Sequence, residues 1–419
     1  MTQPGAQADG GSVGDGHSHL GYQVVDSCAT FLYLYAIASA DDTRDGRRLG
    51  VLNRRELLGA GALAIATAAC GGSTGGGGSA PSIASSALQK KKIENQLLFY
   101  NWAQYHDPKN AKEFSKKYGV AFKESNYTSN EELLTKLQTT KGQSVYDIIV
   151  PDADHVRIEQ NLGLLMPLDH SLIPNLKNLA PHWRNLSYDP GNKYSVMKDT
   201  GITGFTIKTD KVKADLRTWK DFFDFLPTAK GLTVNFIESP AEVIGVALNA
   251  LGYSMNTTSD KELNAARDLL LKVRPKVSTI NEVYLDDFIA GKIDLGITYS
   301  GDGLRIRDAR KAQSDIKVVA PEGRSEIWID NWAISAYAPD PVAAHAWINY
   351  MLEPTVNARE MEYVQYEVGT PASFPLVGAT AKDPLVVFGP RILNNYEILY
   401  TTPEGLNKRT AIWGDFKAA

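Results

Sequence analysis

The sequence predicts an α/β fold with more than one domain, on three observations. From position 97 onward, short apolar runs alternate with longer amphipathic stretches, a pattern typical of strands and helices layered around a largely parallel sheet. The chain has 419 residues, which is more than one hydrophobic core needs, so two domains are expected. No segment of about 20–50 residues repeats, which excludes solenoids and propellers.

The first half of this region predicts alternating strands and helices. Apolar and aromatic runs indicate strands at 97–100, 120–122 and 146–150. A helix is expected at 110–118, ended by Gly119, because glycine favours the backbone conformation that terminates helices. A second helix follows Ser129, whose hydroxyl can accept a free backbone N–H while Glu132 reaches back, as in a capping box.

The second half repeats this arrangement. Strands are expected at 232–237, 293–299, 316–320 and 327–335, and helices at 242–251, 261–273 and 341–352. The last of these helices has Trp347, Ile348 and Met351 at helical spacing, which gives it an apolar face for the core.

Composition excludes several classes of protein. The chain has 44 Lys+Arg against 48 Asp+Glu, whereas a dedicated nucleic-acid binder carries a basic stripe. No uncharged apolar run is long enough for a conventional spanning helix. Two cysteines, Cys28 and Cys70, are too few for a disulfide scaffold or a cysteine-rich metal site. Because motifs for zinc proteases, phosphate loops and Cys/His nucleophiles do not occur, we expect no catalytic residues, no metal and no cofactor.

An export signal is predicted at 51–69. Arg54 and Arg55 precede an apolar run of small residues that ends at Cys70, which is the order of a secretion signal. It resembles a twin-arginine signal joined to a bacterial lipobox at 67–70, although Thr67 stands where leucine is usual. The resemblance implies a diacylglycerol anchor on Cys70; the alternative is a small core helix with a buried cysteine.

The segments on either side of this signal also have predicted roles. Residues 70–96 begin with an almost pure Gly/Ser run, which indicates a flexible tether. Residues 1–50 precede the signal, and we expect them to be either disordered or an extension outside the true translation start near Val51 or Leu52.

Candidate binding residues follow the predicted strands, because ligands of open α/β sheets lie beyond the carboxyl ends of strands. These residues are Trp102, Gln104, Tyr105, Asp152, Asp154, Ser239, Glu242, Tyr299, Trp328 and Asp330. Aromatic faces attract ammonium groups and carboxylates bind them, whereas a site for an anion would use arginine or helix N-termini. The pattern therefore favours a cationic ligand.

Plainer interpretations exist for each residue. The tryptophans could be core residues, Asp152 and Asp154 could be helix N-caps, and Glu242 could be a first-turn charge. His155 is expected to be structural. Asp330 on an apolar strand is harder to explain in this way, because a buried carboxylate needs a partner.

At these residues the sequence resembles bacterial spermidine/putrescine-binding proteins, the lipoproteins and periplasmic proteins that serve polyamine ABC importers. The resemblance extends over about 97–370 and is carried by segments 99–102, 146–151, 251–258 and 328–330, together with Tyr105. It implies a two-lobed periplasmic-binding-protein fold of type II with hinge crossover strands. The lobes are expected at 97–203 plus 328–374 and at 204–327 plus 375–419.

The resemblance also implies a function. A polyamine would bind in the cleft between the lobes, and the closed form would deliver it to the permease of an ABC transporter. By matched position, Trp102, Tyr105, Tyr299 and Trp328 resemble ring walls, while Glu242 and Asp330 resemble amine-binding carboxylates, with Asp330 central. The protein would be an extracytoplasmic, membrane-anchored monomer that binds no nucleic acid and catalyses no reaction.

Several positions depart from the family pattern, so the sequence does not decide which polyamine is bound. Gln104 and Ser239 replace acidic residues of some relatives, Asp152 and Asp154 replace Ser and Tyr, segment 197–200 replaces an aromatic stretch, and Val368 replaces a Tyr. The alternatives are another cationic solute, ferric iron held by Tyr363 and Tyr366, a two-lobed transferase-like enzyme, or a surface adhesin.

Overall fold

The computed structural model describes residues 92–143 and 145–419. The predicted export signal at 51–69, Cys70, the extension at 1–50 and most of the tether at 70–96 lie outside these residues. Within the described ranges, no helix combines the length and the apolar character needed to cross a membrane.

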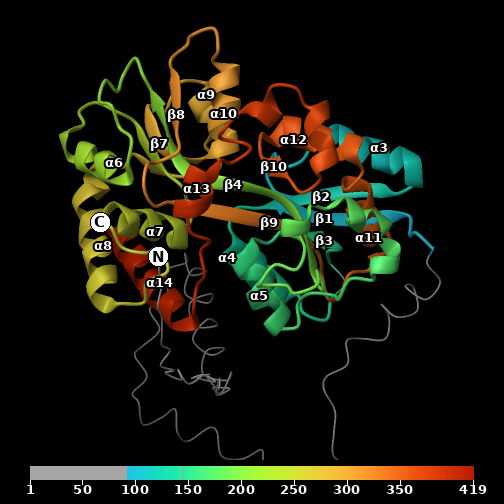
Figure 1. Cartoon of the computed structure of the whole chain (residues 1–419). Coiled ribbons are helices and arrows are strands. Elements are labelled where there is room, and N and C mark those ends of the chain that lie inside the picture. Colours follow the sequence, from blue (N-terminus) through green and yellow to red (C-terminus); the bar gives the residue numbers. More distant parts are fainter. Residues whose placement is uncertain (1–91, 144) are drawn as a thin grey trace, which may run out of the picture. The chain divides into compact units, whose positions relative to one another are not determined.

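The strands form one mixed sheet (Figure 1). Its order is β2-β1-β3-β9-β4-β7-β5-β6, and β8 and β10 also pair with β4. The strands are β1 Gln96–Trp102, β2 Ala121–Tyr127, β3 Ile148–Ile149, β4 Ser195–Lys208, β5 Val234–Phe236, β6 Thr279–Ile280, β7 Leu295–Tyr299, β8 Ile316–Val319, β9 Glu326–Ile334 and β10 Glu367–Val368.

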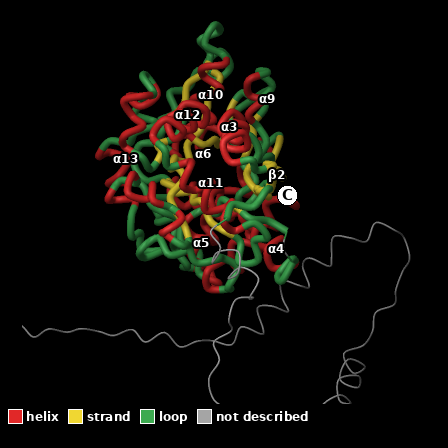
Figure 2. Tube along the Cα trace, turned by 90° about the vertical axis from the view of Figure 1, so that its right-hand side faces the viewer, coloured by secondary structure: helices red, strands yellow, loops and turns green. Residues whose placement is uncertain are grey.

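Helices lie outside the strands, as the view in Figure 2 shows. They are α3 Pro108–Tyr118, α4 Asn130–Thr139, α5 Ala153–Asn161, α6 Trp219–Phe225, α7 Pro240–Ala250, α8 Asp260–Val273, α9 Leu285–Ile289, α10 Ser300–Ala309, α11 Pro341–Met351, α12 Pro354–Val364, α13 Pro390–Asn395 and α14 Pro403–Ala418. The predicted α/β class is therefore confirmed.

The prediction of a largely parallel sheet is correct at the two ends of the sheet and wrong in its middle. Strands β2, β1 and β3 are parallel, as are β6, β5 and β7. The middle strand β4 runs antiparallel to β7, β8, β9 and β10, and β3 runs antiparallel to β9. Antiparallel pairs arise here because β4 and β9 are crossover strands rather than parts of βαβ units.

The two largest hydrophobic clusters divide the described residues into two lobes. The first core gathers buried side chains from 97–197 and 329–356, and the second gathers those from 205–319 and 412–416. We call the parts around these cores the first and second lobes. Strand β4 joins them, because Val196 packs in the first core and Phe205 in the second.

Helix caps in the first lobe show how the local sequence sets the structure. The Ser129 hydroxyl accepts a hydrogen bond from the backbone N–H of Glu132 at 3.1 Å, as predicted. The Glu132 carboxylate reaches back to the backbone N–H of Thr128 at 2.8 Å rather than to that of Ser129. The second hydrogen bond of the predicted capping box therefore involves the residue before Ser129 instead of Ser129 itself.

A bulge interrupts β4 next to β9. Met197 pairs with Asn331 and Asp199 pairs with Asp330, so Lys198 is the extra residue. A bulge changes the direction in which side chains point. Here it places Asp199 directly opposite Asp330, in the strand pair that joins the lobes.

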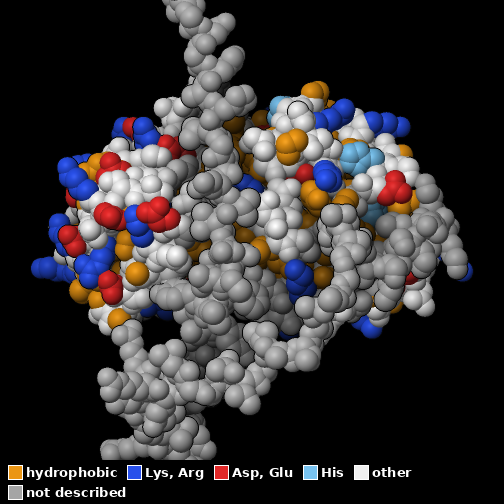
Figure 3. Space-filling view, turned by 90° about the horizontal axis from the view of Figure 1, so that it is seen from below, with side chains coloured by type: hydrophobic (Ala, Val, Ile, Leu, Met, Phe, Trp, Pro, Cys, Tyr) orange, Lys and Arg blue, Asp and Glu red, His pale blue; other side chains and the backbone are white. Residues whose placement is uncertain are grey.

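Charged side chains of both signs are interspersed over the left-hand part of the face in Figure 3. This mixture on one face agrees with the near balance of acidic and basic residues in the whole sequence.

Candidate functional site

A cavity of about 120 Å³ lies between the two lobes. Eight of the predicted binding residues line it: Trp102, Gln104, Tyr105, Asp152, Glu242, Tyr299, Trp328 and Asp330. They come from the end of β1, the start of α5, the start of α7, the end of β7 and the middle of β9. The strand ends that the sequence identified separately therefore meet around one space.

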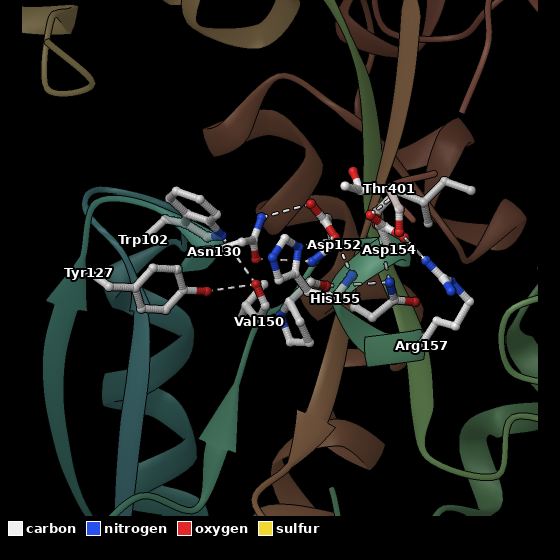
Figure 4. Close-up of polar contacts among 12 residues, drawn as sticks. Trp102, Tyr127, Asn130, Val150, Asp152, Asp154, His155, Arg157 and Thr401 are labelled. Carbon is white, nitrogen blue, oxygen red and sulfur yellow. Dashed lines mark hydrogen bonds and ion pairs between the residues drawn. The ribbon is translucent and has the colours of Figure 1, made fainter. Parts of the chain in front are cut away.

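Asp154 and Ser239 do not line this cavity. Both line a smaller adjoining cavity, which shares Trp102, Asp152 and Glu242 with the first. As Figure 4 shows, the Asp154 carboxylate pairs with the Arg157 guanidinium at 2.5 Å and accepts from the backbone N–H of Thr401 at 2.8 Å. Asp154 therefore already has partners in the chain.

Aromatic rings form the walls of the main cavity. The indole N–H of Trp102 donates to the carbonyl of Val150 at 3.1 Å, which fixes the ring, and Tyr127 packs 4.7 Å away (Figure 4). On the other side, the Trp328 ring is edge-on to Tyr366 at 4.8 Å and to Tyr299 at 5.8 Å.

Trp328 can take this place because residue 201 is a glycine. A Cβ atom at position 201 would lie 2.2 Å from the Trp328 ring, so any larger residue would displace the ring from this position.

Asp330 lies on β9 in a largely buried position, with 8% of its surface exposed. The Tyr105 hydroxyl lies 2.8 Å from its carboxylate and 2.5 Å from that of Asp199 on the neighbouring strand. Burial, together with the charges of Asp199 and Asp152, raises the pKa of Asp330 well above its ordinary range. The carboxyl group is therefore costly to ionise unless a cation approaches.

A buried ammonium group stands beside this pair. The Lys198 side chain is fully buried, and its Nζ lies 2.5 Å from Asp199 and 3.5 Å from Glu360. The same Nζ is 3.7 Å from the centre of the Tyr105 ring. Lys198 thus compensates Asp199, and Tyr105 connects the two carboxylates.

The second lobe contributes Glu242 on α7 and Glu282 after β6. Burial and the neighbouring acidic groups raise the pKa of Glu242 well above its ordinary range, and burial raises the pKa of Glu282 to about 7. The Tyr299 hydroxyl lies near both carboxyl groups and opposes the rise in the pKa of each. Among the described residues, Glu242 Oε2 is buried and has no hydrogen-bond partner.

Asp152 has a structural role as well as a place in the cavity wall. Its carboxylate caps α5 by accepting from the backbone N–H of His155 at 2.7 Å, and Asn130 donates to it at 2.8 Å (Figure 4). His155 Nδ1 also lies 3.0 Å away. Burial alone would lower the pKa of His155, but the Asp152 carboxylate raises it to about 10. The imidazolium is therefore the cation that Asp152 already holds.

We expect His155 to remain protonated in the folded protein at pH 8. Because its folded pKa of about 10 exceeds the ordinary 6.5, the Asp152–His155 interaction stabilises the fold fully below pH 6.5 and is lost as pH rises through about 10. Titration of the imidazole resonances by NMR tests this, with exposed His182 as the reference. Asp152→Asn should return the His155 midpoint toward 6.5, and a midpoint near 6.5 in the wild-type protein would contradict the assignment.

The acidic groups around the cavities divide into two sets. Four have a cation of the chain beside them, in the pairs Asp152–His155, Asp154–Arg157, Asp199–Lys198 and Asp302–Arg305. In the part of the chain that the structure describes, Glu242, Glu282 and Asp330 have no Lys, Arg or His nitrogen within 4.0 Å. The same holds for Asp286, which lines the main cavity, and for Glu131, which lines the adjoining one. These five carboxyl groups are therefore the ones open to an external cation.

The cavity also contains residues that the sequence did not single out as binding residues. Those with polar or aromatic side chains are Tyr127, Thr128, Asn130, Glu282, Tyr284, Asp286, Asp302, Arg305 and Tyr366. The sequence suggests Tyr366 only as an iron ligand together with Tyr363. In the structure the Arg305 guanidinium lies over the Tyr363 ring at 5.2 Å, whereas Tyr366 packs on Trp328.

Known proteins resemble this chain over most of the described residues. A family model described as bacterial extracellular solute-binding protein matches residues 109–386. The spermidine/putrescine-binding periplasmic protein of Escherichia coli (strain K12) is 34% identical over 274 residues, which is 65% of this chain and 77% of that protein. The putrescine-binding periplasmic protein of Pseudomonas aeruginosa (strain UCBPP-PA14) is 32% identical over 337 residues, or 76% of this chain and 90% of that protein.

A solved structure also resembles this chain. A structure assigned to a spermidine/putrescine ABC transporter of Listeria monocytogenes superposes with a TM-score of 0.72 at 32% identity. The match covers 77% of this chain and 99% of that one.

Proposed function

Because this chain belongs to the family of bacterial extracellular solute-binding proteins, as its motifs predicted, we propose that it is the substrate-binding component of an ABC importer and that its ligand is a polyamine of the spermidine/putrescine class. Its relatives are named as spermidine/putrescine-binding and putrescine-binding proteins. These names support a polyamine ligand over ferric iron, and ligand binding over a transferase reaction. We assign the lobe boundaries as predicted from the sequence, 97–203 plus 328–374 and 204–327 plus 375–419.

One observation carries this proposal: the cleft is walled by aromatic rings, and its uncompensated carboxyl groups come from both lobes. Asp330 belongs to the first lobe, and Glu242 and Glu282 belong to the second. A charge-assisted hydrogen bond to an ammonium contributes about 1.5–3 kcal/mol, and a ring face adds about 0.5–2 kcal/mol. Flat rings such as Trp102 also pack the methylene groups between amines.

The distribution of these carboxyl groups over both lobes explains how a ligand would close the cleft. A ligand shifts an equilibrium between open and closed forms only by binding one of them more tightly. A polyamine that contacts Asp330 and Glu242 at once satisfies both carboxylates only when the lobes are together. The closed form is the one that the permease would recognise, and no covalent chemistry is required.

The proposed location rests on the relatives and on the N-terminal motif. The curated relatives are periplasmic proteins. The sequence at 67–70, which ends in Cys70, supports a lipid anchor on the outer side of the cell membrane. We assign the protein as an anchored monomer with a permease partner and without catalytic activity.

Tryptophan fluorescence should change on titration with putrescine or spermidine and should saturate. Trp102 and Trp328 line the cavity, so a bound amine alters their surroundings. Trp102→Phe and Trp328→Phe should each remove part of the signal. Trp413→Phe is the control, because Trp413 packs in the second core and does not line the cavity. A response to choline, a basic amino acid or ferric salt, with none to either polyamine, would reject the proposed ligand.

A further inference from the structure

We propose that the empty cleft holds a proton on Asp330 and that a cationic ligand expels this proton when it binds. The inference rests on the proposed function and adds a property of the same site, namely that binding is coupled to proton release. The proton passes from the Asp330 carboxyl group to water or buffer, and the ligand ammonium takes its place.

The geometry at Tyr105 requires an additional proton. Its hydroxyl group carries one hydrogen, yet its oxygen lies 2.5 Å from an oxygen of Asp199 and 2.8 Å from an oxygen of Asp330. Both distances are those of O–H···O hydrogen bonds. One hydrogen can serve only one of them, so the other contact needs a hydrogen from a carboxyl group.

Lys198 decides which carboxyl group carries that hydrogen. Its ammonium lies 2.5 Å from Asp199 and opposes the rise that burial causes in the pKa of Asp199. Asp199 is therefore the more readily ionised of the two carboxyl groups, and the Tyr105 hydroxyl donates to it. Asp330 has no such cation and faces Asp199 directly across the strand pair, where like charges are unfavourable. Asp330 therefore carries the proton and donates it to the Tyr105 oxygen.

The other groups around Asp330 also favour its protonated state. The charged or titratable groups from the elements packed around it are Asp199 and Lys198 on β4, Tyr105 after β1, Tyr127 on β2, Asp152 and His155 at α5, Tyr188, and Glu360 on α12. The cations of this set already have partners, since Lys198 pairs with Asp199 and Glu360 and His155 pairs with Asp152. No unshared positive charge among these groups supports an ionised Asp330.

A ligand ammonium shifts Asp330 from its protonated to its ionised form, because an adjacent cation favours the ionised carboxylate. Thermodynamic linkage then makes the affinity depend on pH. For each proton released, the association constant rises about tenfold per pH unit while the free carboxyl group remains protonated. The cleft would consequently bind its ligand more weakly in acidic surroundings.

Isothermal titration calorimetry with putrescine tests the proposal in the wild-type protein. The amino groups of putrescine resemble that of lysine, with a pKa near 10.4, so the ligand itself neither gains nor loses protons at pH 6.5. The titration is run in phosphate and in a zwitterionic sulfonate buffer of larger ionisation enthalpy, because amine buffers are themselves cations. We expect the two observed enthalpies to differ by an amount equivalent to at least one proton released per ligand.

The variant Asp199→Asn distinguishes the proton on Asp330 from other protons released in the cleft. An amide at 199 donates to the Tyr105 oxygen and leaves the hydroxyl free to donate to an ionised Asp330. The variant should release one proton fewer than the wild-type protein. If it does not fold, Asp330→Asn takes its place, because a variant that lacks this carboxyl group should also release one proton fewer than the wild-type protein.

The failures of the two proposals are distinguishable. Absence of binding to any polyamine rejects the proposed function. Binding with equal enthalpies in both buffers and a flat pH profile overturns the proton proposal and leaves the function intact. An unchanged proton count in Asp199→Asn overturns the assignment to Asp330.

Discussion

Asp330→Asn should weaken polyamine binding by about 2–5 kcal/mol, which is a loss of roughly 30-fold or more in affinity. The amide keeps the volume of the side chain but cannot carry the negative charge that a bound ammonium needs. The ligand would then place a cation in the cleft with its partner from the first lobe missing. Calorimetry with putrescine and spermidine measures the loss directly.

The same variant should fold almost as stably as the wild-type protein when no ligand is present. Asn resembles the protonated carboxyl group that the empty cleft holds, so little changes without ligand. Asp224→Asn is the matched control, because Asp224 is an exposed carboxylate paired with Lys220 outside the cavity. Full affinity in Asp330→Asn would remove Asp330 from the centre of the proposed site.

Much of the site could be predicted because the sheet imposes a simple rule. Within each lobe, parallel strands deliver their carboxyl ends to the same edge, where ligands of open α/β sheets bind. Trp102 at the end of β1 and Tyr299 at the end of β7 could therefore each be assigned to a ligand-binding edge without knowing the strand order. The α/β class followed from the alternation of strands and helices in the same way.

This rule could not predict other parts of the site. Glu282 follows β6, whose two residues give too short an apolar run to be recognised as a strand. The 14-residue strand β4 was not predicted, because Lys198, Asp199 and Thr200 interrupt its apolar pattern. These polar residues are buried through tertiary contacts alone, and the bulge that aligns Asp199 with Asp330 has no local sequence signal.

Asp152 shows why competing interpretations can both describe one residue. The sequence left its use as a helix cap and its place in a binding site as alternatives. The carboxylate caps α5 and also lines the cavity. A helix that begins at a strand end brings its capping residue to the same edge as the ligand, so the two interpretations do not compete there.

Lys198→Met should destabilise the folded protein by about 3–5 kcal/mol, the range observed when one partner of a buried ion pair is removed. Methionine has nearly the length of lysine and preserves most of the packing against Tyr105 and Trp332. What is lost is the positive charge between Asp199 and Glu360, both of which are fully or almost fully buried. Urea unfolding followed by circular dichroism gives the difference in free energy.

The pH dependence of this loss identifies its electrostatic origin. In the variant, burial raises the pKa of Asp199 without the opposing ammonium, so folding is penalised as pH rises above the unfolded value near 3.9. The deficit should therefore be larger at pH 8 than at pH 5, whereas a packing defect would be the same at both. Lys117→Met, which removes an ammonium that is 48% exposed and pairs with Glu353, should cost less than about 1 kcal/mol. A deficit in Lys198→Met that does not vary with pH would mean that Lys198 contributes by packing and not by its charge.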